Sequence, residues 1–213
     1  MSPATPAPAT PSRPKSSSAW AGVDVGGRRK GFDLAVLDDD RLVESIPRVS
    51  SAESARRALA AHRPQVVAID SPRSAAMAGR TLRECERELR DAVCGIRWTP
   101  DQRELDQGSA YYEWIRLGLE LYEALAEAGP WEVIEVFPTA SWTRWVGRRR
   151  GARAAWTRAA LWRLPLRELP SRTNQDARDA IAAAVTARQY ALGETDRFGP
   201  IVVPKPGLPG RRA

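Results

Sequence analysis

The sequence contains few of the residues on which several classes of site depend. Two cysteines, Cys85 and Cys94, and one histidine, His62, occur among its 213 residues. Two cysteines exclude a disulfide-rich scaffold, and their separation fits no common zinc-binding spacing. A single histidine argues against a histidine-dependent catalytic triad and against a histidine-rich metal site.

Long apolar segments are also absent. A membrane-spanning helix needs ~18 or more consecutive apolar residues, and the sequence has no such run. Residues 1–18 are rich in Pro, Ala, Ser and Thr and lack the apolar stretch of a secretory signal. We therefore expect a disordered tail over 1–18, a cytoplasmic location and no membrane partner.

The net charge of +7 is unevenly distributed. Residues 144–172 contain nine arginines and one acid, whereas residues 19–143 carry 16 basic and 21 acidic side chains. Four of the eight tryptophans lie in or beside the basic segment, and arginine with interleaved aromatics suits phosphate contacts and base stacking. The alternative is a solvated helix with its tryptophans in the core. The length favours one domain, which we place at 19–204.

Hydrophobic patterning predicts a mixed sheet covered by helices, an α/β fold. The strands are predicted at 20–25, 32–37, 42–49, 66–69, 131–137 and 201–203, the first three as a hairpin meander. The helices are predicted at 51–61, 79–91, 109–128 and 173–191, with two short helices in the Arg/Trp-rich segment 142–172. A basic tail follows at 205–213, and residues 92–108 are expected to be irregular.

Three carboxylates interrupt apolar strands. Asp24 lies in the first predicted strand, Asp70 closes the strand at 66–69, and Glu135 lies within 131–137. A charge on a buried strand is costly unless it is paired or binds a cation. Asp176 and Asp179 lie three residues apart on one face of an alanine-rich helix, which can pack closely on a sheet and bring its acids near the strand ends.

Clustered carboxylates without histidine suit hard divalent cations such as Mg²⁺ or Mn²⁺, which prefer oxygen ligands. Two such ions ~4 Å apart can activate water in phosphodiester cleavage. Each acid also has a structural interpretation. Asp176 can serve the helix dipole, Asp70 a turn, Asp24 the Gly26-Gly27 turn, and Glu135 an ion pair with a buried arginine.

Three basic residues are candidates for phosphate binding. Arg83 and Arg90 are seven residues apart, on one face of a predicted helix, and Lys30 follows the first strand. Ion pairing of the two arginines with Glu86 and its neighbours is an equally weighted alternative.

Several short motifs, in this order, resemble the domain-of-unknown-function 429 family, whose members are predicted nucleases of RNase-H-like fold. The matching pieces are Gly22-Val23-Asp24 with Lys30-Gly31-Phe32, Ala68-Ile69-Asp70-Ser71-Pro72, Arg83-Glu84-Cys85-Glu86 with Leu89-Arg90, Glu135-Val136-Phe137-Pro138, and Asp176-Ala177-Arg178-Asp179-Ala180.

The resemblance implies a five-stranded mixed sheet whose first three strands are antiparallel. It also implies a metal site built from Asp24, Asp70 and Asp179, with Glu135 or Asp176 nearby. The leading hypothesis is thus a Mg²⁺- or Mn²⁺-dependent nuclease acting on DNA or RNA. Two alternatives stay open: a non-catalytic nucleic-acid or partner-binding module, and a small actin-like or sugar-kinase-like ATP-binding protein suggested by residues 22–27.

Overall fold

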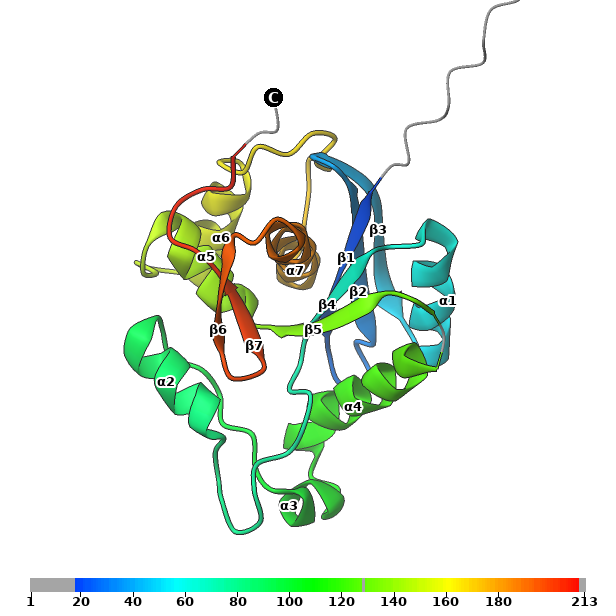
Figure 1. Ribbon diagram of the computed structural model, residues 1–213, viewed down its shortest axis with the longest axis vertical. Coiled ribbons are helices and arrows are strands. Elements are labelled where there is room, and N and C mark those ends of the chain that lie inside the picture. The colour runs from blue at the N-terminus through cyan, green and yellow to red at the C-terminus, as the bar shows by residue number, and fades with distance from the viewer. Residues whose placement is uncertain (1–17, 128, 211–213) are drawn as a thin grey trace, which may run out of the picture.

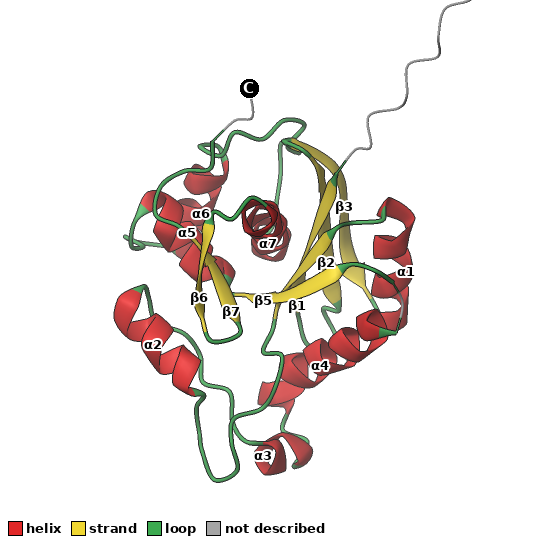
Figure 2. Cartoon of the chain, in the orientation of Figure 1, coloured by secondary structure: helices red, strands yellow, loops and turns green. Residues whose placement is uncertain are grey.

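The computed structural model of the protein describes residues 18–127 and 129–210 and consists of a central sheet with helices on both faces (Figure 1; Figure 2). The strands are β1 (Ala19–Val25), β2 (Phe32–Asp38), β3 (Arg41–Val49), β4 (Val66–Asp70), β5 (Glu132–Val136), β6 (Thr195–Phe198) and β7 (Ile201–Pro204). The helices are α1 (Ala52–His62), α2 (Glu84–Ala92), α3 (Gln102–Asp106), α4 (Glu113–Ala126), α5 (Pro138–Val146), α6 (Arg153–Leu161) and α7 (Gln175–Ala191), with a 3-10 turn η1 (Ala110–Tyr112).

The sheet is mixed and has the strand order β3-β2-β1-β4-β5-β7-β6. The expected antiparallel pairing of the first three strands is confirmed. β1, β4, β5 and β7 then run parallel to one another. Their carboxyl ends therefore meet at one edge, where residues that follow the strands come together.

The expectation of five strands was wrong, because the sheet has seven. The strand that patterning missed altogether is β6, whose sequence Thr-Asp-Arg-Phe is half-exposed and polar. It pairs only with β7 at the edge of the sheet, and an edge strand with one neighbour needs no apolar alternation. The region at 92–108, expected to be irregular, contains the short helix α3.

Helix α7 packs against β1 more closely than any other helix packs on the sheet. Side chains at alternate positions of β1 point to this helix, and Gly22 is one of those positions. A Cβ atom at Gly22 would overlap the backbone of α7 at Ala180 and Ala184. Glycine on the strand and alanine on the helix thus bring the first turn of α7 down to the carboxyl ends of β1 and β4.

The two faces of the sheet have separate cores. Trp20, Ala68, Ile134 and the alanines of α7 form one, with α5 and α6. Ala21, Val23 and Ile69 belong to the other, beneath α1 and α4. Figure 1 shows α7 on one side of the sheet and α1 with α4 on the other.

The segment between β4 and α4 forms an excursion below the sheet in Figure 1, and it includes α2 and α3. Most of the predicted tail at 1–18 lies outside the described residues, and the basic tail at 205–213 is described only as far as Gly210. No helix in the described part of the chain has the length and apolarity that a bilayer span requires.

Candidate active site

One cavity of about 830 Å³ opens at the carboxyl edge of the sheet, between the first turn of α7, the α5–α6 connection and the excursion. All the predicted catalytic, metal-binding and substrate-binding residues line it: Asp24, Lys30, Asp70, Arg83, Arg90, Glu135, Asp176 and Asp179. They come from segments up to 155 residues apart, so the fold alone brings them together.

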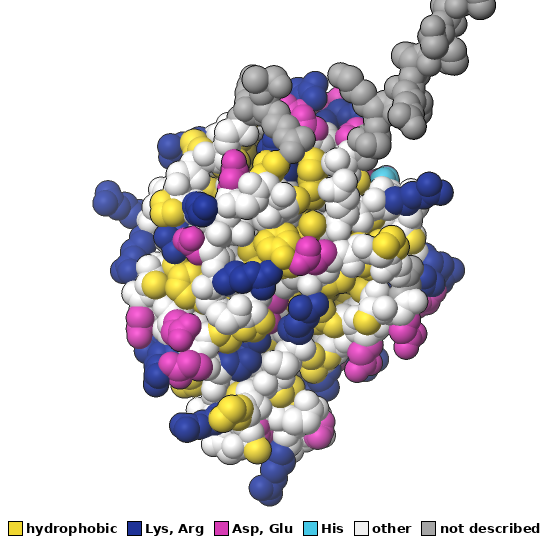
Figure 3. Space-filling model, viewed as in Figure 1, with side chains coloured by type: hydrophobic (Ala, Val, Ile, Leu, Met, Phe, Trp, Pro, Cys, Tyr) yellow, Lys and Arg dark blue, Asp and Glu magenta, His cyan; other side chains and the backbone are white. Residues whose placement is uncertain are grey.

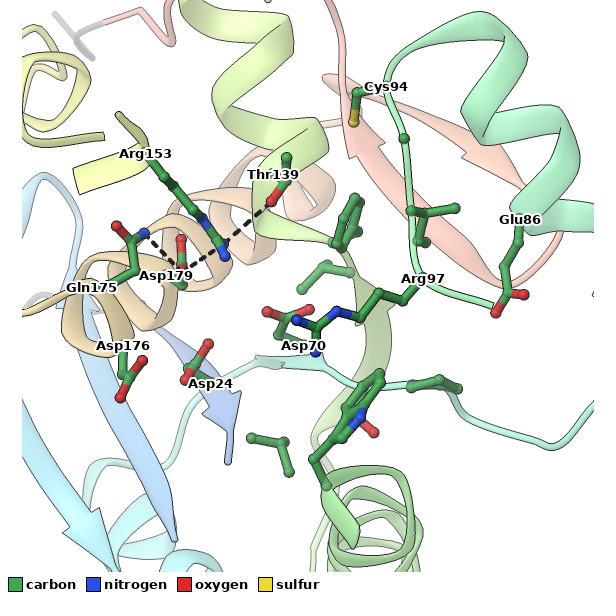
Figure 4. A pocket seen from close by; sticks show the side chains of 18 of the residues that line it. Asp24, Asp70, Glu86, Cys94, Arg97, Thr139, Arg153, Gln175, Asp176 and Asp179 are labelled. Atoms are coloured by element: carbon green, nitrogen blue, oxygen red, sulfur yellow. Dashed lines mark hydrogen bonds and ion pairs between the residues drawn. The ribbon is translucent and has the colours of Figure 1, made fainter. Parts of the chain in front are cut away.

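Asp24 and Asp70 form the floor of this cavity. They are register partners on the adjacent parallel strands β1 and β4, and both point to the α7 face because they share the parity of Trp20 and Ala68. The close-up in Figure 4 marks interactions of Asp179 with Gln175 and Arg153 and none to Asp24 or Asp70. Neither carboxyl forms an ion pair with a residue in 18–127 or 129–210, although the Arg97 guanidinium lies beside Asp70 in the close-up.

The pKa values of both floor carboxyls are raised. Burial raises the pKa of Asp24 well above its usual value of 3.8, and the Asp70 charge raises it further. Burial also raises the pKa of Asp70, to about 8, with a further contribution from the charge of Asp179. Near neutral pH, such a pair holds a proton between its members or binds a cation.

The acids on α7 face the same cavity and already have partners. Asp179, which is 2% exposed, accepts hydrogen bonds from Trp142 Nε1 (3.0 Å), Arg153 (2.9 Å) and Gln175 (2.9 Å). Burial nevertheless raises its pKa, against the opposing effect of Arg153.

Asp176 pairs with Lys30, whose Nζ lies 2.8 and 3.1 Å from its two carboxylate oxygens. This hydrogen bond raises the pKa of Lys30. A tight turn positions the lysine: the Gly26 amide donates a hydrogen bond to the Gly31 carbonyl, and Gly31 has a φ of 70° that favours glycine. Lys30, which the sequence predicts as a phosphate ligand, is therefore paired with an acid that lines the same cavity.

Glu135 reaches the cavity from the opposite face of the sheet. It is the register partner of Ile69, which packs in the core beneath α1 and α4. Arg83 donates to both of its oxygens, at 2.5 and 3.0 Å, and the Arg73 amide donates at 2.8 Å. The structural alternative, a buried ion pair, is what the geometry shows at this position.

The two predicted phosphate-binding arginines differ in their surroundings. Arg83 is buried, and its Nε donates a hydrogen bond to Glu86, which also accepts one from the Thr99 amide. Arg90 lies with its guanidinium 4.8 Å from the ring centre of Trp98 and pairs with Asp91 at 3.1 Å. Arg83 thus fastens α2 to β5, while Arg90 is half-exposed at the cavity wall.

Sequence reasoning missed several residues of the site. Arg153, Gln175 and Trp142 hold Asp179, and only their membership of the basic segment or the helix start pointed to them. Asp33 pairs with Asp24 across β1 and β2 and is 3% exposed, with a buried Oδ1 that has no partner among the described residues. Burial raises its pKa. It stands in a strand with no sign that distinguishes it from a surface residue.

The Arg/Trp-rich segment divides between core and cavity. Trp142 and Trp145 are buried in the core, as the structural interpretation held, whereas Trp156, Arg148 and Arg149 line the cavity. On the face shown in Figure 3, basic side chains are spread among acidic and apolar ones and form no single continuous patch.

The donor set suits a hard divalent cation, because the floor presents carboxylate oxygens, the ligands that such ions prefer. Within residues 18–127 and 129–210, however, no group of three or more His, Cys, Asp or Glu side chains is arranged to hold a metal ion. Lys30 and Arg153 form ion pairs with Asp176 and Asp179, respectively. The carboxylates of Asp24 and Asp70 suit a metal ion. Asp176 and Asp179 could join them as ligands only when Lys30 and Arg153 release these acids.

Comparison with known proteins gives one family and a set of distant structures. The family described as "Protein of unknown function (DUF429)" matches residues 22–202. The solved "Thermus thermophilus RuvC structure" is 20% identical, with a TM-score of 0.47, covering 82% of this chain and 96% of that one. "T. thermophilus RuvC in complex with Holliday junction substrate" is also 20% identical, with a TM-score of 0.48, covering 83% and 96%. No curated protein matches the sequence.

Proposed function

The chain belongs to the DUF429 family, and from the chemistry of its cavity we propose that it is a metal-dependent nuclease that hydrolyses a phosphodiester bond in nucleic acid. The observation that carries this proposal is the Asp24–Asp70 pair. Two half-buried carboxyls with raised pKa values lie side by side at the floor of a cavity that arginines also line. Carboxylates at the floor can hold a cation, and the arginines around them can hold a phosphate. A metal ion and a phosphodiester bound together require both.

Asp24 and Asp70 would hold a Mg²⁺ or Mn²⁺ ion, with Asp179 and Asp176 as further ligands. Such an ion, when bound, lowers the pKa of an attacking water and neutralises charge on the leaving oxygen. The protein's own contribution is to keep the two carboxyls in register and partly desolvated. Because both carboxyls are partly desolvated, a divalent cation would gain more here than on an exposed acidic surface.

Lys30 and Arg153 would exchange partners when the site is filled. Each pairs with one acid of α7, and each side chain is long and partly exposed. A phosphate beside the floor offers both an alternative anion, which would free Asp176 and Asp179. In this proposal Arg83 and Glu135 position α2 and β5 and do not touch the substrate.

The proposal extends to an RNase-H-like arrangement of the fold. Three antiparallel strands are followed by parallel β4 and β5, and α7 lies across β1 with its acids at the carboxyl edge. This topology supports a first acid on β1, a second on β4 and a third on the last long helix.

The test is cleavage by the purified full chain with Mg²⁺ or Mn²⁺ on single-stranded DNA and RNA, duplexes, hybrid and branched junctions. We expect cleavage of at least one of them, its loss with chelator, and a drop of at least ~100-fold for Asp24→Asn and Asp70→Asn. Asp106→Asn, at an exposed position on α3, is the matched control. Absence of metal-dependent cleavage on the whole panel would exclude the proposal.

One observation favours a second candidate, a nucleic-acid-binding module without catalysis. Three of the predicted acids, Glu135, Asp176 and Asp179, already sit in ion pairs. Salt-sensitive binding that is unchanged by chelator and by Asp24→Asn, without cleavage, would support this candidate.

A further inference from the structure

Two tryptophans line the cavity from opposite faces of the sheet. Trp114 stands at the start of α4, which packs with α1, and Trp156 stands on α6, which packs with α7. Neither is fully buried. The indole N–H of Trp114 is buried and has no hydrogen-bond partner in the described part of the chain. A buried donor without an acceptor at a cavity wall is costly, and a ligand oxygen would satisfy it.

Arginines without an acidic partner lie at the same cavity. Arg97, Arg148 and Arg149 line it, and none of the three forms an ion pair with any residue in 18–127 or 129–210. Figure 4 shows the Arg97 side chain reaching over the floor toward Asp70. The other two stand in the α5–α6 connection, between Gly147 and Gly151, whose φ angles of 86° and 79° turn the chain sharply.

From these two sets of side chains, and resting on the proposed function, we infer that the substrate segment entering this cavity is unpaired: a single strand, an overhang or an opened position. One of its bases lies against Trp114 or Trp156, and its phosphates lie on Arg97, Arg148 and Arg149. Indole faces alternating with arginines are the means by which proteins hold single strands without reading their sequence.

An intact duplex would gain nothing from the tryptophans. Its bases cover one another's faces, so no face is free to meet an indole inside a cavity. A base within a duplex reaches a protein pocket only after it has been taken out of the stack, which costs unstacking and unpairing energy. The cavity's two indole walls therefore favour the unpaired form, whether the sugar is ribose or deoxyribose.

Binding in the absence of metal separates this inference from the nuclease proposal. The Asp24→Asn chain in chelator is titrated into fluorescent 20-nucleotide DNA, the same sequence as RNA, and a covalently closed duplex circle that has no ends or loops. We expect one or both single strands to bind at least ~10-fold more tightly than the closed duplex, with DNA and RNA arms showing which sugar is preferred. Equal or tighter binding of the closed duplex overturns the inference.

Substitutions assign the preference to the cavity. Trp114→Leu and Trp156→Leu should each weaken single-strand binding by at least ~5-fold, and leave binding of the closed duplex unchanged. Trp162→Leu, at a tryptophan that is 58% exposed and outside the cavity, is the control. Because leucine at 114 can disturb α4, Trp114→Phe is the second variant: it keeps an aromatic face, lacks the N–H, and should retain most of the stacking contribution.

Arg148→Gln with Arg149→Gln should weaken binding and lower its salt dependence by roughly one counterion per arginine. If the cavity tryptophans matter no more than Trp162, the inference is wrong. Single-strand preference without cleavage of any substrate would remove the nuclease proposal and leave the cavity as a binding site. Cleavage together with a preference for the closed duplex would support the nuclease proposal and overturn the inference of an unpaired substrate.

Discussion

Asp24 and Asp70 are register partners on adjacent parallel strands, and neither carboxyl forms an ion pair with a residue in 18–127 or 129–210. Like charges on neighbouring strands destabilise a sheet unless they share a proton or a cation. Burial is the main cause of the raised pKa of both carboxyls, and for Asp24 the charge of Asp70 adds to it. The pair therefore lowers the stability of the folded protein and favours the binding of a cation. The first effect can be measured as the free energy of unfolding of the protein without metal.

Asp70→Asn should stabilise the metal-free protein in a pH-dependent way. The pKa of Asp70 is about 8 in the folded protein against 3.8 ordinarily, so the folded state binds the proton more tightly than the unfolded chain. Wild-type stability should fall as pH rises from ~4 to ~8, and the variant should not share this fall. We expect a gain of ~1–3 kcal/mol at pH 8 and almost none at pH 4, measured by urea unfolding.

Asp106→Asn is the control for this measurement and should leave the pH profile unchanged. Millimolar Mn²⁺ should raise wild-type stability at pH 8 more than that of Asp70→Asn. An equal gain of the variant at pH 4 and pH 8 would contradict the assignment of the cost to ionisation.

Arg153→Gln should strengthen divalent-cation binding to the free protein. Arg153 lies 2.9 Å from Asp179 and partly neutralises it, so its removal leaves an acid free to act as a ligand. We expect Mn²⁺ affinity, measured by calorimetry, to rise ~3-fold or more. A gain of this size follows if the Arg153 charge opposes Mn²⁺ binding by about 1 kcal/mol. Nucleic-acid binding should become weaker. Arg158→Gln, on an exposed position of the same helix, should change neither. Unchanged Mn²⁺ affinity in Arg153→Gln would mean that Asp179 is not a metal ligand.

Arg83→Leu should destabilise the protein by ~3–5 kcal/mol, because it leaves two buried carboxylates, Glu86 and Glu135, without their cation. Arg87→Leu is the matched control: it breaks an exposed pair with Glu84 on the same helix and should cost less than ~1 kcal/mol. Chemical denaturation at pH 7 measures both. A similar small loss in the two variants would show that the Arg83 network is not a structural link.

Gly22→Ala should separate α7 from β1, since a Cβ atom there would overlap the backbone of Ala180 and Ala184. We expect a loss of ~2 kcal/mol or more in unfolding free energy and a larger loss of metal affinity than stability alone explains. Gly95→Ala, where nothing lies within 4 Å of the added atom, should be neutral. Full retention of stability in Gly22→Ala would contradict the described contact.

The sequence was sufficient to find the carboxylates but not their partners. Asp24, Asp70 and Asp179 stand out because each interrupts an apolar run or an alanine-rich helix, and burying such a charge has a known cost. The pairing of Lys30 with Asp176 joins residues 146 positions apart. Such a pair depends on the whole topology, and nothing local indicates it.

The face on which Glu135 lies illustrates the same limit. In buried parallel strands both faces are apolar, so Glu-Val-Ile-Glu-Val has no alternation that shows which side each residue faces. Only the register with β4 shows that the side chains of Glu135 and Asp70 lie on opposite faces of the sheet. β6 was missed for the converse reason, since an edge strand of polar residues resembles a loop.

The burial of α7 has a consequence for how this protein can diversify. Its residues from Arg178 to Gln189 are all buried, so the acids it carries cannot be repositioned without rebuilding the interior. The arginines and tryptophans that face them stand on the α5–α6 connection, on the segment carrying Arg97 and at helix starts. The outer segments can therefore be exchanged to alter the rim of the cavity while the acids stay in place, so that its framework and its rim can change independently.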